Sequence, residues 1–166
     1  YRYNATKSKK NKAPATRMVS LAPAIGARRK NFESALKVGQ TIGKAINYAK
    51  QLGNLPGNIC TPNYLAKESK ALAERHGALT AQVLNEKQMA RLGMGSLLSV
   101  AAGSNEEARL IVIKHRGARN SRPHVLVGKG ITFDTGGISL KPGAAMDEMK
   151  FDMCGAASVI ATMRGI

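Results

Sequence analysis

The chain has 166 residues, of which 43% are apolar and only 4% aromatic. This length suits one domain with an aliphatic core, and the apolar fraction excludes a wholly disordered chain. No apolar run approaches the roughly 20 residues that cross a bilayer, so a transmembrane protein is excluded. The two cysteines, Cys60 and Cys154, form no CxxC pair, which excludes a disulfide scaffold and favours a reducing cytoplasm. The sequence begins with Tyr1 and not with Met, so we expect it to be part of a longer one, and its first residues show no signal-peptide pattern.

The net charge of +16 is concentrated near the N-terminus. Residues 1–50 contain 12 Lys or Arg and a single acid, Glu33, which is an excess of +11. A basic segment of this kind can hold phosphates. We favour a solvated arm or a contact with an acidic neighbouring chain, because no aromatic residues interleave with the basic cluster Lys7–Lys12 as a stacking platform requires.

The first quarter of the chain predicts little regular structure before one long helix. Residues 1–17 are polar and basic and are expected to form an arm, with a short strand at Met18–Ala22. A helical stripe of apolar residues predicts a helix over 31–52, and Gly53 suits the position just after a helix end. This helix is a candidate linker between two domains.

The next segments carry strong local signals. The Thr-Pro pair at 61–62 is typical of an N-cap followed by the first helical position, and this helix is expected to run to about His76. The apolar run Leu79–Leu84 predicts a strand. Asn85 and Gln88 have the spacing of a capping box for a short helix.

The second half predicts buried strands and a long loop. The continuous apolar runs Leu110–Ile113 and Val125–Val127 are typical of strands covered on both faces. Residues 128–152 have no clear period, and loops of this length are usually functional. Residues 153–164 predict a small-residue helix in which Gly155 and the alanines after it pack tightly on the sheet. The order of elements predicts an α/β fold with a mixed, largely buried sheet flanked by helices.

Scarce carboxylates cluster around the long loop. All three Asp of the chain, Asp134, Asp147 and Asp152, fall within 19 residues. Lys129 and Asp134 should lie at or just beyond the end of a buried strand, where open α/β sheets bind ligands. Asp152 lies at or near the start of the last helix. Two carboxylates on opposite sides of one loop can hold a divalent cation.

Other interpretations of this glycine-rich loop compete with a metal site. It lacks the Walker pattern of a phosphate loop. It also lacks the dinucleotide pattern, because Phe133 stands where the third glycine is needed. An aspartate before two glycines is more often a turn residue than a ligand. The residues by themselves therefore leave both a turn and a metal site open.

The segments GKGITFDTGGISLKP, from Gly128, and MDEMKFDMCGAA, from Met146, closely resemble the leucyl (cytosol) aminopeptidase family in its bacterial form. The resemblance extends over most of the chain and includes NLPGNICTPNYLA from Asn54. Members of this family are two-metal exopeptidases. The resemblance implies the first half of their catalytic domain at 54–166, preceded by a linker helix at 31–53 and by a remnant of an N-terminal α/β domain at 1–30.

The resemblance also implies roles for individual residues. Lys129 matches a lysine ligand of one metal, Asp134 a carboxylate that bridges both metals, and Asp152 a further ligand near the substrate's amino group. Lys141 matches the catalytic lysine that polarises the scissile carbonyl, and Met149 matches a residue of the pocket for the first side chain. A coordinating lysine must be neutral, and burial together with the adjacent dication must favour that form. Lys141 is expected to stay charged to stabilise an oxyanion.

One part of the family pattern is missing. Family members carry a later NTDAEGR motif, whose Asp and Glu complete the metal sites and whose Arg helps to bind a bicarbonate, and it does not occur before Ile166. Three protein ligands cannot properly hold two metals, so we expect the isolated 166-residue chain to be inactive.

The expected function of the parent protein is metal-dependent release of N-terminal amino acids, leucine among the favoured ones, from peptides in the cytoplasm. The resemblance implies two divalent ions, zinc or manganese with magnesium as a further option, and a homohexamer. Two alternatives stay open. Some bacterial relatives also bind DNA, for which the basic residues at 1–50 are candidates. A protein that kept the fold without the activity is the other, although retention of the lysines and aspartates named above argues against it.

Overall fold

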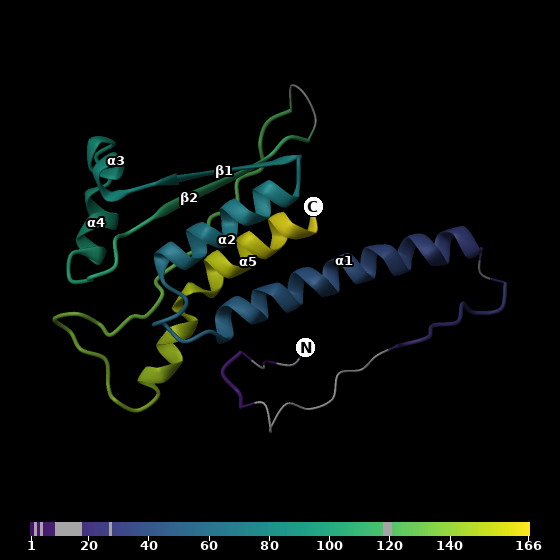
Figure 1. Ribbon diagram of the computed structural model, residues 1–166, viewed down its shortest axis with the longest axis horizontal. Helices are drawn as coiled ribbons and strands as arrows, with labels where there is room; N and C mark the ends of the chain where they lie inside the picture. Colours follow the sequence, from purple (N-terminus) through teal and green to yellow (C-terminus); the bar gives the residue numbers. More distant parts are fainter. Residues whose placement is uncertain (2, 4, 9–17, 27, 118–120) are drawn as a thin grey trace.

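The computed structural model describes residues 1, 3, 5–8, 18–26, 28–117 and 121–166 (Figure 1). The helices are α1 (Arg29–Asn54), α2 (Pro62–Arg75), α3 (Glu86–Arg91), α4 (Gly95–Ala101) and α5 (Cys154–Gly165), and the 3-10 helix η2 (Met146–Met153) leads directly into α5. The strands are β1 (Leu79–Leu84) and β2 (Leu110–His115). The α/β class expected from the sequence is confirmed.

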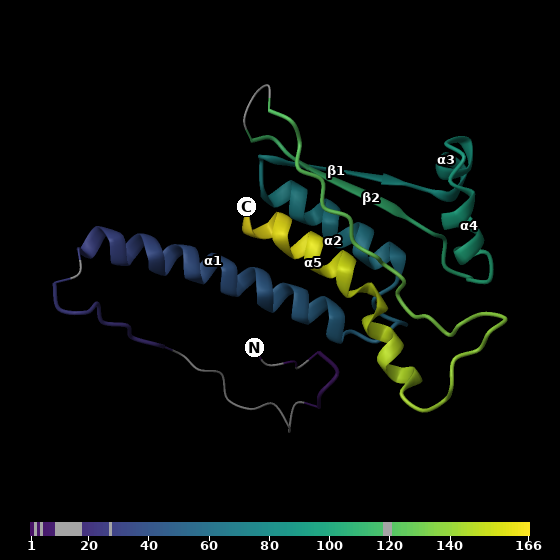
Figure 2. The same cartoon turned by 180° about the vertical axis from the view of Figure 1, so that it is seen from behind.

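The elements form layers. β1 and β2 pair antiparallel, with Leu79 opposite His115 and Leu84 opposite Leu110. Both views show α2 and α5 side by side beneath this sheet, and α1 on the far side of α5 (Figures 1 and 2). The short helices α3 and α4 lie at the end of the sheet where β1 finishes and β2 starts. The strand residues are mostly half-buried, so the sheet is less covered than the apolar runs suggested.

Local sequence signals explain where the middle elements begin. The Thr61 hydroxyl accepts a hydrogen bond of 3.2 Å from the Tyr64 N–H, and Pro62 stands in the first turn of α2, where its missing N–H costs nothing. At α3, Asn85 and Gln88 exchange two hydrogen bonds of 2.9 Å each, which completes the predicted capping box. The predicted strand Leu79–Leu84 is confirmed at both ends.

The core lies where α1, α2 and α5 meet. Its apolar side chains include Leu52 and Leu72, which are almost fully buried, and Met153 from the end of η2. At the edge of the core, the Tyr48 hydroxyl donates a 2.8 Å hydrogen bond to Glu68. Burial is the main cause that raises the pKa of Tyr48, and the Glu68 carboxylate raises it further. The Arg164 guanidinium lies 4.5 Å from the centre of the Tyr48 ring. Three helices are therefore joined by both apolar and polar contacts.

Two strand predictions were wrong. Met18–Ala22 forms no strand, and Met18 and Val19 are 82% and 73% exposed. Val125–Val127 is also outside any strand, with Val127 90% exposed. An apolar run becomes a buried strand only where other elements pair with it and cover it, and none of the elements in the described part of the chain does so here. Lys129 and Asp134 consequently follow a segment without regular secondary structure rather than a buried strand.

Other expectations were close or remain predictions. The long helix predicted over 31–52 is α1, longer by two residues at each end. The basic cluster Lys7–Lys12 lies largely outside the described residues, because 9–12 are not among them. The division into segments 1–30, 31–53 and 54–166 stays a prediction. In the described residues, no helix combines the length and the apolar character needed to cross a membrane.

Candidate metal centre

Lys129 and Asp152 meet although they are far apart in sequence. Lys129 Nζ lies 2.9 Å from Asp152 Oδ1, and the two side chains are 58% and 21% exposed. Asp152 stands near the end of η2, two residues before α5 begins. The backbone reinforces this contact, because the Ala156 N–H in the first turn of α5 donates a 2.8 Å hydrogen bond to the Lys129 carbonyl. The ion pair therefore joins the glycine-rich loop to the end of η2, and the backbone hydrogen bond joins it to the start of α5.

Asp134 and Lys141 form a second ion pair, within the loop itself. Lys141 Nζ lies 3.5 Å from Asp134 Oδ2, while Asp134 Oδ1 accepts a 2.8 Å hydrogen bond from the Gly136 N–H. The Lys141 N–H donates to the Thr135 carbonyl at 2.9 Å, which closes the loop. The hydrogen bond from Gly136 holds the pKa of Asp134 below its ordinary value, and the ammonium groups of Lys141 and Lys129 add to this effect.

These contacts place four of the residues that the sequence singled out in two ion pairs, Lys129 with Asp152 and Lys141 with Asp134. The ammonium of Lys129 also contributes, as the smallest of several causes, to the lowered pKa of Asp134. Met149 is half-buried on η2, the same 3-10 helix that carries Asp152. Asp147, also on η2, is exposed in the first turn, as expected for a carboxylate at a helix N-terminus.

One oxygen at this site lacks a partner. Asp152 Oδ2 is buried and has no hydrogen-bond partner among the residues that the structure describes, although its sister oxygen pairs with Lys129. A buried carboxylate oxygen without a partner is costly, and a cation would satisfy it. With Lys129 and Asp134, Asp152 gives a donor set of one amine and two carboxylates, which fits a divalent ion. In the described residues, no group of three His, Cys, Asp or Glu side chains is placed to hold a metal, so a fuller site needs other ligands.

The exposure of Lys129 corrects one sequence expectation. Burial was expected to help keep a coordinating lysine neutral, but its side chain is 58% exposed and lies against a carboxylate. The Lys129 side chain is therefore less buried than that expectation required.

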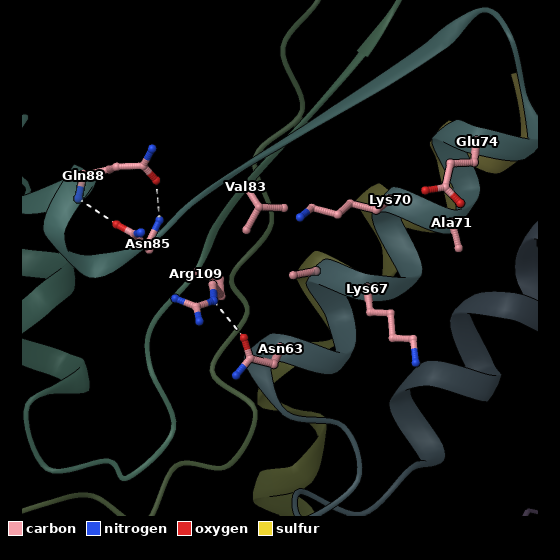
Figure 3. A pocket seen from close by; sticks show the side chains of 10 residues that line it. Asn63, Lys67, Lys70, Ala71, Glu74, Val83, Asn85, Gln88 and Arg109 are labelled. Carbon is pink, nitrogen blue, oxygen red and sulfur yellow. Dashed lines mark hydrogen bonds between the residues drawn. The ribbon is translucent and has the colours of Figure 1, made fainter.

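A separate groove of about 570 Å³ lies between α2, β1 and the start of β2 (Figure 3). Lys67 and Lys70 of α2 line it, with Val83 on the strand side and Arg109 near the Asn63 end. None of the candidate metal ligands lines this groove. The sequence analysis did not identify it, because it is made by side chains from four separate segments.

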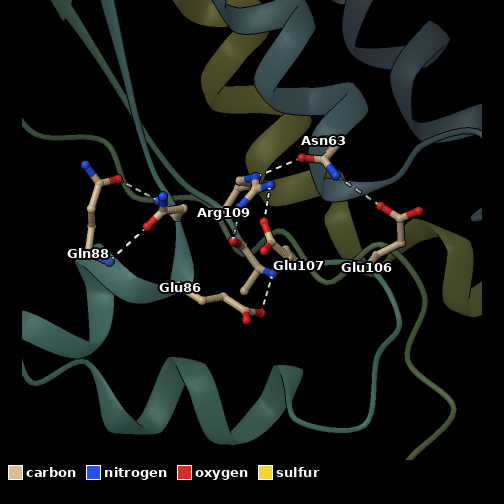
Figure 4. A network of polar contacts seen from close by, with 8 residues as sticks. Asn63, Glu86, Gln88, Glu106, Glu107 and Arg109 are labelled. Carbon is tan, nitrogen blue, oxygen red and sulfur yellow. Dashed lines mark hydrogen bonds and ion pairs between the residues drawn. The ribbon is translucent and has the colours of Figure 1, made fainter.

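The groove ends at a polar network that joins α2, α3 and the start of β2 (Figure 4). Arg109 donates a 2.8 Å hydrogen bond to Asn63 and pairs with Glu107. Glu86 accepts a 2.8 Å hydrogen bond from the Ala108 N–H. The Arg109 side chain is only 16% exposed, so this network serves to fix the chain that enters β2.

Comparison with known proteins gives a consistent result. A "Probable cytosol aminopeptidase" from Saccharophagus degradans is 54% identical over 167 residues, and one from Alkalilimnicola ehrlichii is 52% identical over 168; each match covers 100% of this chain. Among solved structures, the bottromycin maturation enzyme BotP in complex with Mn has a TM-score of 0.70 and 34% identity over 84% of this chain. A mutant of tomato leucine aminopeptidase has a TM-score of 0.68 and 31% identity over 80% of it.

The matches cover only part of each relative. The chain spans 33% and 34% of the two curated relatives, and 30% and 25% of the two solved chains. The model of the cytosol aminopeptidase family, catalytic domain, matches residues 47–166, which include every candidate ligand. The chain therefore belongs to the cytosol aminopeptidase family.

Proposed function

We propose that this chain carries part of the active centre of a metal-dependent aminopeptidase that removes N-terminal amino acids, leucine among the favoured ones, from peptides. The observation that carries the proposal is the buried, unpartnered Asp152 Oδ2 beside Lys129. Membership of the cytosol aminopeptidase family supports the reaction class. Likeness to a leucine aminopeptidase supports the side-chain preference.

Lys129, Asp134 and Asp152 are the residues that would hold divalent metal. The Mn complex of the structural neighbour BotP supports manganese, and zinc or magnesium suits the same donors. When bound, such ions polarise a carbonyl and supply an activated water at neutral pH. We propose two ions, which need more ligands than the three named here.

The chain's own residues supply the remaining functions. The Lys141 ammonium is the donor that would stabilise negative charge on the carbonyl oxygen of the scissile bond. Its backbone hydrogen bond to Thr135 and its ion pair with Asp134 hold it in place before substrate arrives. Asp134, whose pKa lies below its ordinary value, is an ionised carboxylate at neutral pH. Asp152 would orient the free amine of the peptide, and Met149 would contact its first side chain.

The wider properties of the protein are also proposals. We propose a homohexamer in the cytoplasm, with bicarbonate assisting as a general base. The curated relatives are about three times as long as this chain. We therefore propose that residues 1–166 alone do not hydrolyse peptides.

The test is hydrolysis of a leucine arylamide by the whole natural polypeptide that includes residues 1–166. We expect activity that requires Mn²⁺ and that a chelator removes. Lys129→Ala should abolish it, whereas Lys114→Ala, which changes an exposed lysine on β2, should retain it. Activity that survives both the chelator and Lys129→Ala would contradict the proposal.

DNA binding is a second candidate function. The exposed surface of α1 carries Arg29, Lys30, Lys37, Lys44 and Lys50 against the single acid Glu33. Such a surface would bind DNA through phosphates, with an affinity that falls steeply as salt is added. Gel-shift titrations at two salt concentrations test this, and an absence of binding at low ionic strength would remove the candidate.

A further inference from the structure

Two glycines bring the backbones of the loop and of α5 into direct contact. We call this contact, made by Gly128, Lys129, Gly155 and Ala156, the glycine crossing. A Cβ atom on Gly128 would overlap the Gly155 carbonyl and would lie only 2.7 Å from Ala156 N. A Cβ atom on Gly155 would lie 2.8 Å from Lys129 N and 3.1 Å from Lys129 O. Neither position can therefore hold a side chain unless the backbone moves.

In the glycine crossing, the backbone of Lys129 contacts α5 through both its N and its O atom. Its N atom faces Gly155, and its carbonyl accepts the 2.8 Å hydrogen bond from Ala156 N–H. The Ala156 N–H is one of the first amides of α5, which have no partner inside the helix, so the carbonyl satisfies a donor that would otherwise be unpaired. The contact is thus fixed by shape and by one hydrogen bond.

The position of the crossing relates it to the candidate metal centre. Gly155 is three residues after Asp152, and Gly128 directly precedes Lys129, so the crossing joins the two segments that carry these side chains. Lys129 Nζ and Asp152 Oδ1 are 2.9 Å apart beside it. If the loop backbone and the α5 backbone moved apart, the Lys129 amine and the Asp152 carboxylate, the two proposed metal ligands, would also change their separation. Ligand positions must hold to within a fraction of an ångström for tight binding.

We propose that Gly128 and Gly155 are positioning residues for the metal centre, because the absence of their side chains sets the spacing between Lys129 and Asp152. This inference rests on the proposed metal binding by those two residues. It extends that proposal to two residues that cannot themselves bind an ion.

The test measures Mn²⁺ affinity by titration, with unbound Mn²⁺ followed by electron paramagnetic resonance, in the whole natural polypeptide. Gly155→Ala and Gly128→Ala should each weaken binding at least tenfold. The matched control is Gly130→Ala in the same loop, whose Cβ would lie 3.2 Å from the Ala156 side chain rather than against backbone. It should change affinity less than threefold. Far-ultraviolet circular dichroism of the metal-free variants checks that the fold is kept.

A double-mutant cycle separates positioning from a general effect on the fold. In a Lys129→Ala background, Gly155→Ala should cause no further loss of Mn²⁺ affinity. Equal losses with and without Lys129 would overturn the inference, as would loss of the metal-free fold in both glycine variants or wild-type affinity in both. If Lys129→Ala itself leaves Mn²⁺ affinity unchanged, Lys129 is not a metal ligand. The proposed metal site then fails, and the inference about the glycines fails with it. The single Lys129→Ala variant distinguishes this outcome from a failure of the glycine inference alone.

Discussion

The two lysines of the candidate metal centre are held in different ways. Lys129 is fixed by another element, because its backbone contacts Gly155 and Ala156 and its side chain pairs with Asp152. Lys141 is fixed inside one loop, by its backbone hydrogen bond to Thr135 and its ion pair with Asp134, only seven residues before it. One half of the site thus depends on tertiary packing and the other on a local turn. Variants should therefore separate the two halves.

The largest expected effect is a loss of catalytic rate when Lys141, the lysine held within the loop, is replaced. Lys141→Ala should lower kcat for a leucine arylamide about 10²–10³-fold, because it removes the proposed donor to the developing oxyanion. Mn²⁺ affinity should stay near the wild-type value, in contrast to Lys129→Ala. Steady-state kinetics and Mn²⁺ titration of the same preparation measure both quantities. Lys150→Ala, which removes a cation 4.9 Å from the Phe151 ring, is the control on η2. A kcat within twofold of wild type for Lys141→Ala would rule out this role.

The next effect concerns the turn that places Lys141. Gly136 has φ +92°, and a Cβ atom there would overlap the Ser139 carbonyl and lie 2.8 Å from Lys141 N. Gly137 also has positive φ, +61°, but open space around it. Gly137→Ala should lower the free energy of unfolding by about 1–2 kcal/mol through backbone strain alone, and Gly136→Ala should lower it further through the added clash. Urea unfolding of the two variants measures the difference, and equal losses would show that the clash is relieved without cost.

A smaller gain in stability is expected where the loop enters η2. Ala145 has φ +61°, and in the described part of the chain it is the only residue besides glycines with a positive φ. Ala145→Gly should raise the free energy of unfolding by about 0.5–1 kcal/mol, because glycine adopts this conformation without strain. Ala144→Gly is the matched control and should lower it, since glycine adds only entropy to the unfolded chain there. Urea unfolding measures both variants, and a loss of stability in Ala145→Gly would contradict the claim that Ala145 is strained.

The smallest expected effect is a pH dependence from Asp134. Its pKa in the folded protein lies below the ordinary value of 3.8, chiefly because of the Gly136 N–H. Its contribution to stability is therefore complete above the unfolded pKa and is lost as the pH falls through the folded pKa. Asp134→Asn should be less stable than wild type at neutral pH, and the difference should shrink below pH 3.8. Denaturant unfolding over this pH range measures the difference in the free energy of unfolding. A difference that grows as the pH falls would contradict the prediction.

The same contrast between local and tertiary contacts explains what the sequence could predict. The start of α2 at Pro62, the capping box of α3 and both ends of β1 follow from neighbouring residues, and all are confirmed. The strand expected at Val125–Val127 depended on cover from other elements and was wrong. Apolar patterning shows that a segment can be buried, but it does not show what buries it.

The candidate site divides in the same way. The residues themselves indicated clustered carboxylates around a glycine-rich loop, but they left a simple turn open. Roles for Lys129, Lys141 and Met149 came from the family resemblance, and those roles stay predictions. The contact of Lys129 with Asp152 joins residues 23 positions apart, and no sequence period encodes such a pair. Gly155 was expected to pack tightly against the sheet, whereas its close contact is with the backbone of Lys129.

The most direct test of the central claim is the Mn²⁺ affinity of Asp152→Asn in the whole natural polypeptide. This change keeps the size of the side chain but replaces the oxygen pair that includes the buried, unpartnered Oδ2. We predict at least tenfold weaker binding, equivalent to about 1.4 kcal/mol. Asp147→Asn, at an exposed position on the same 3-10 helix, should bind as wild type does. Unchanged Mn²⁺ affinity in Asp152→Asn would contradict the assignment of this carboxylate to the metal centre.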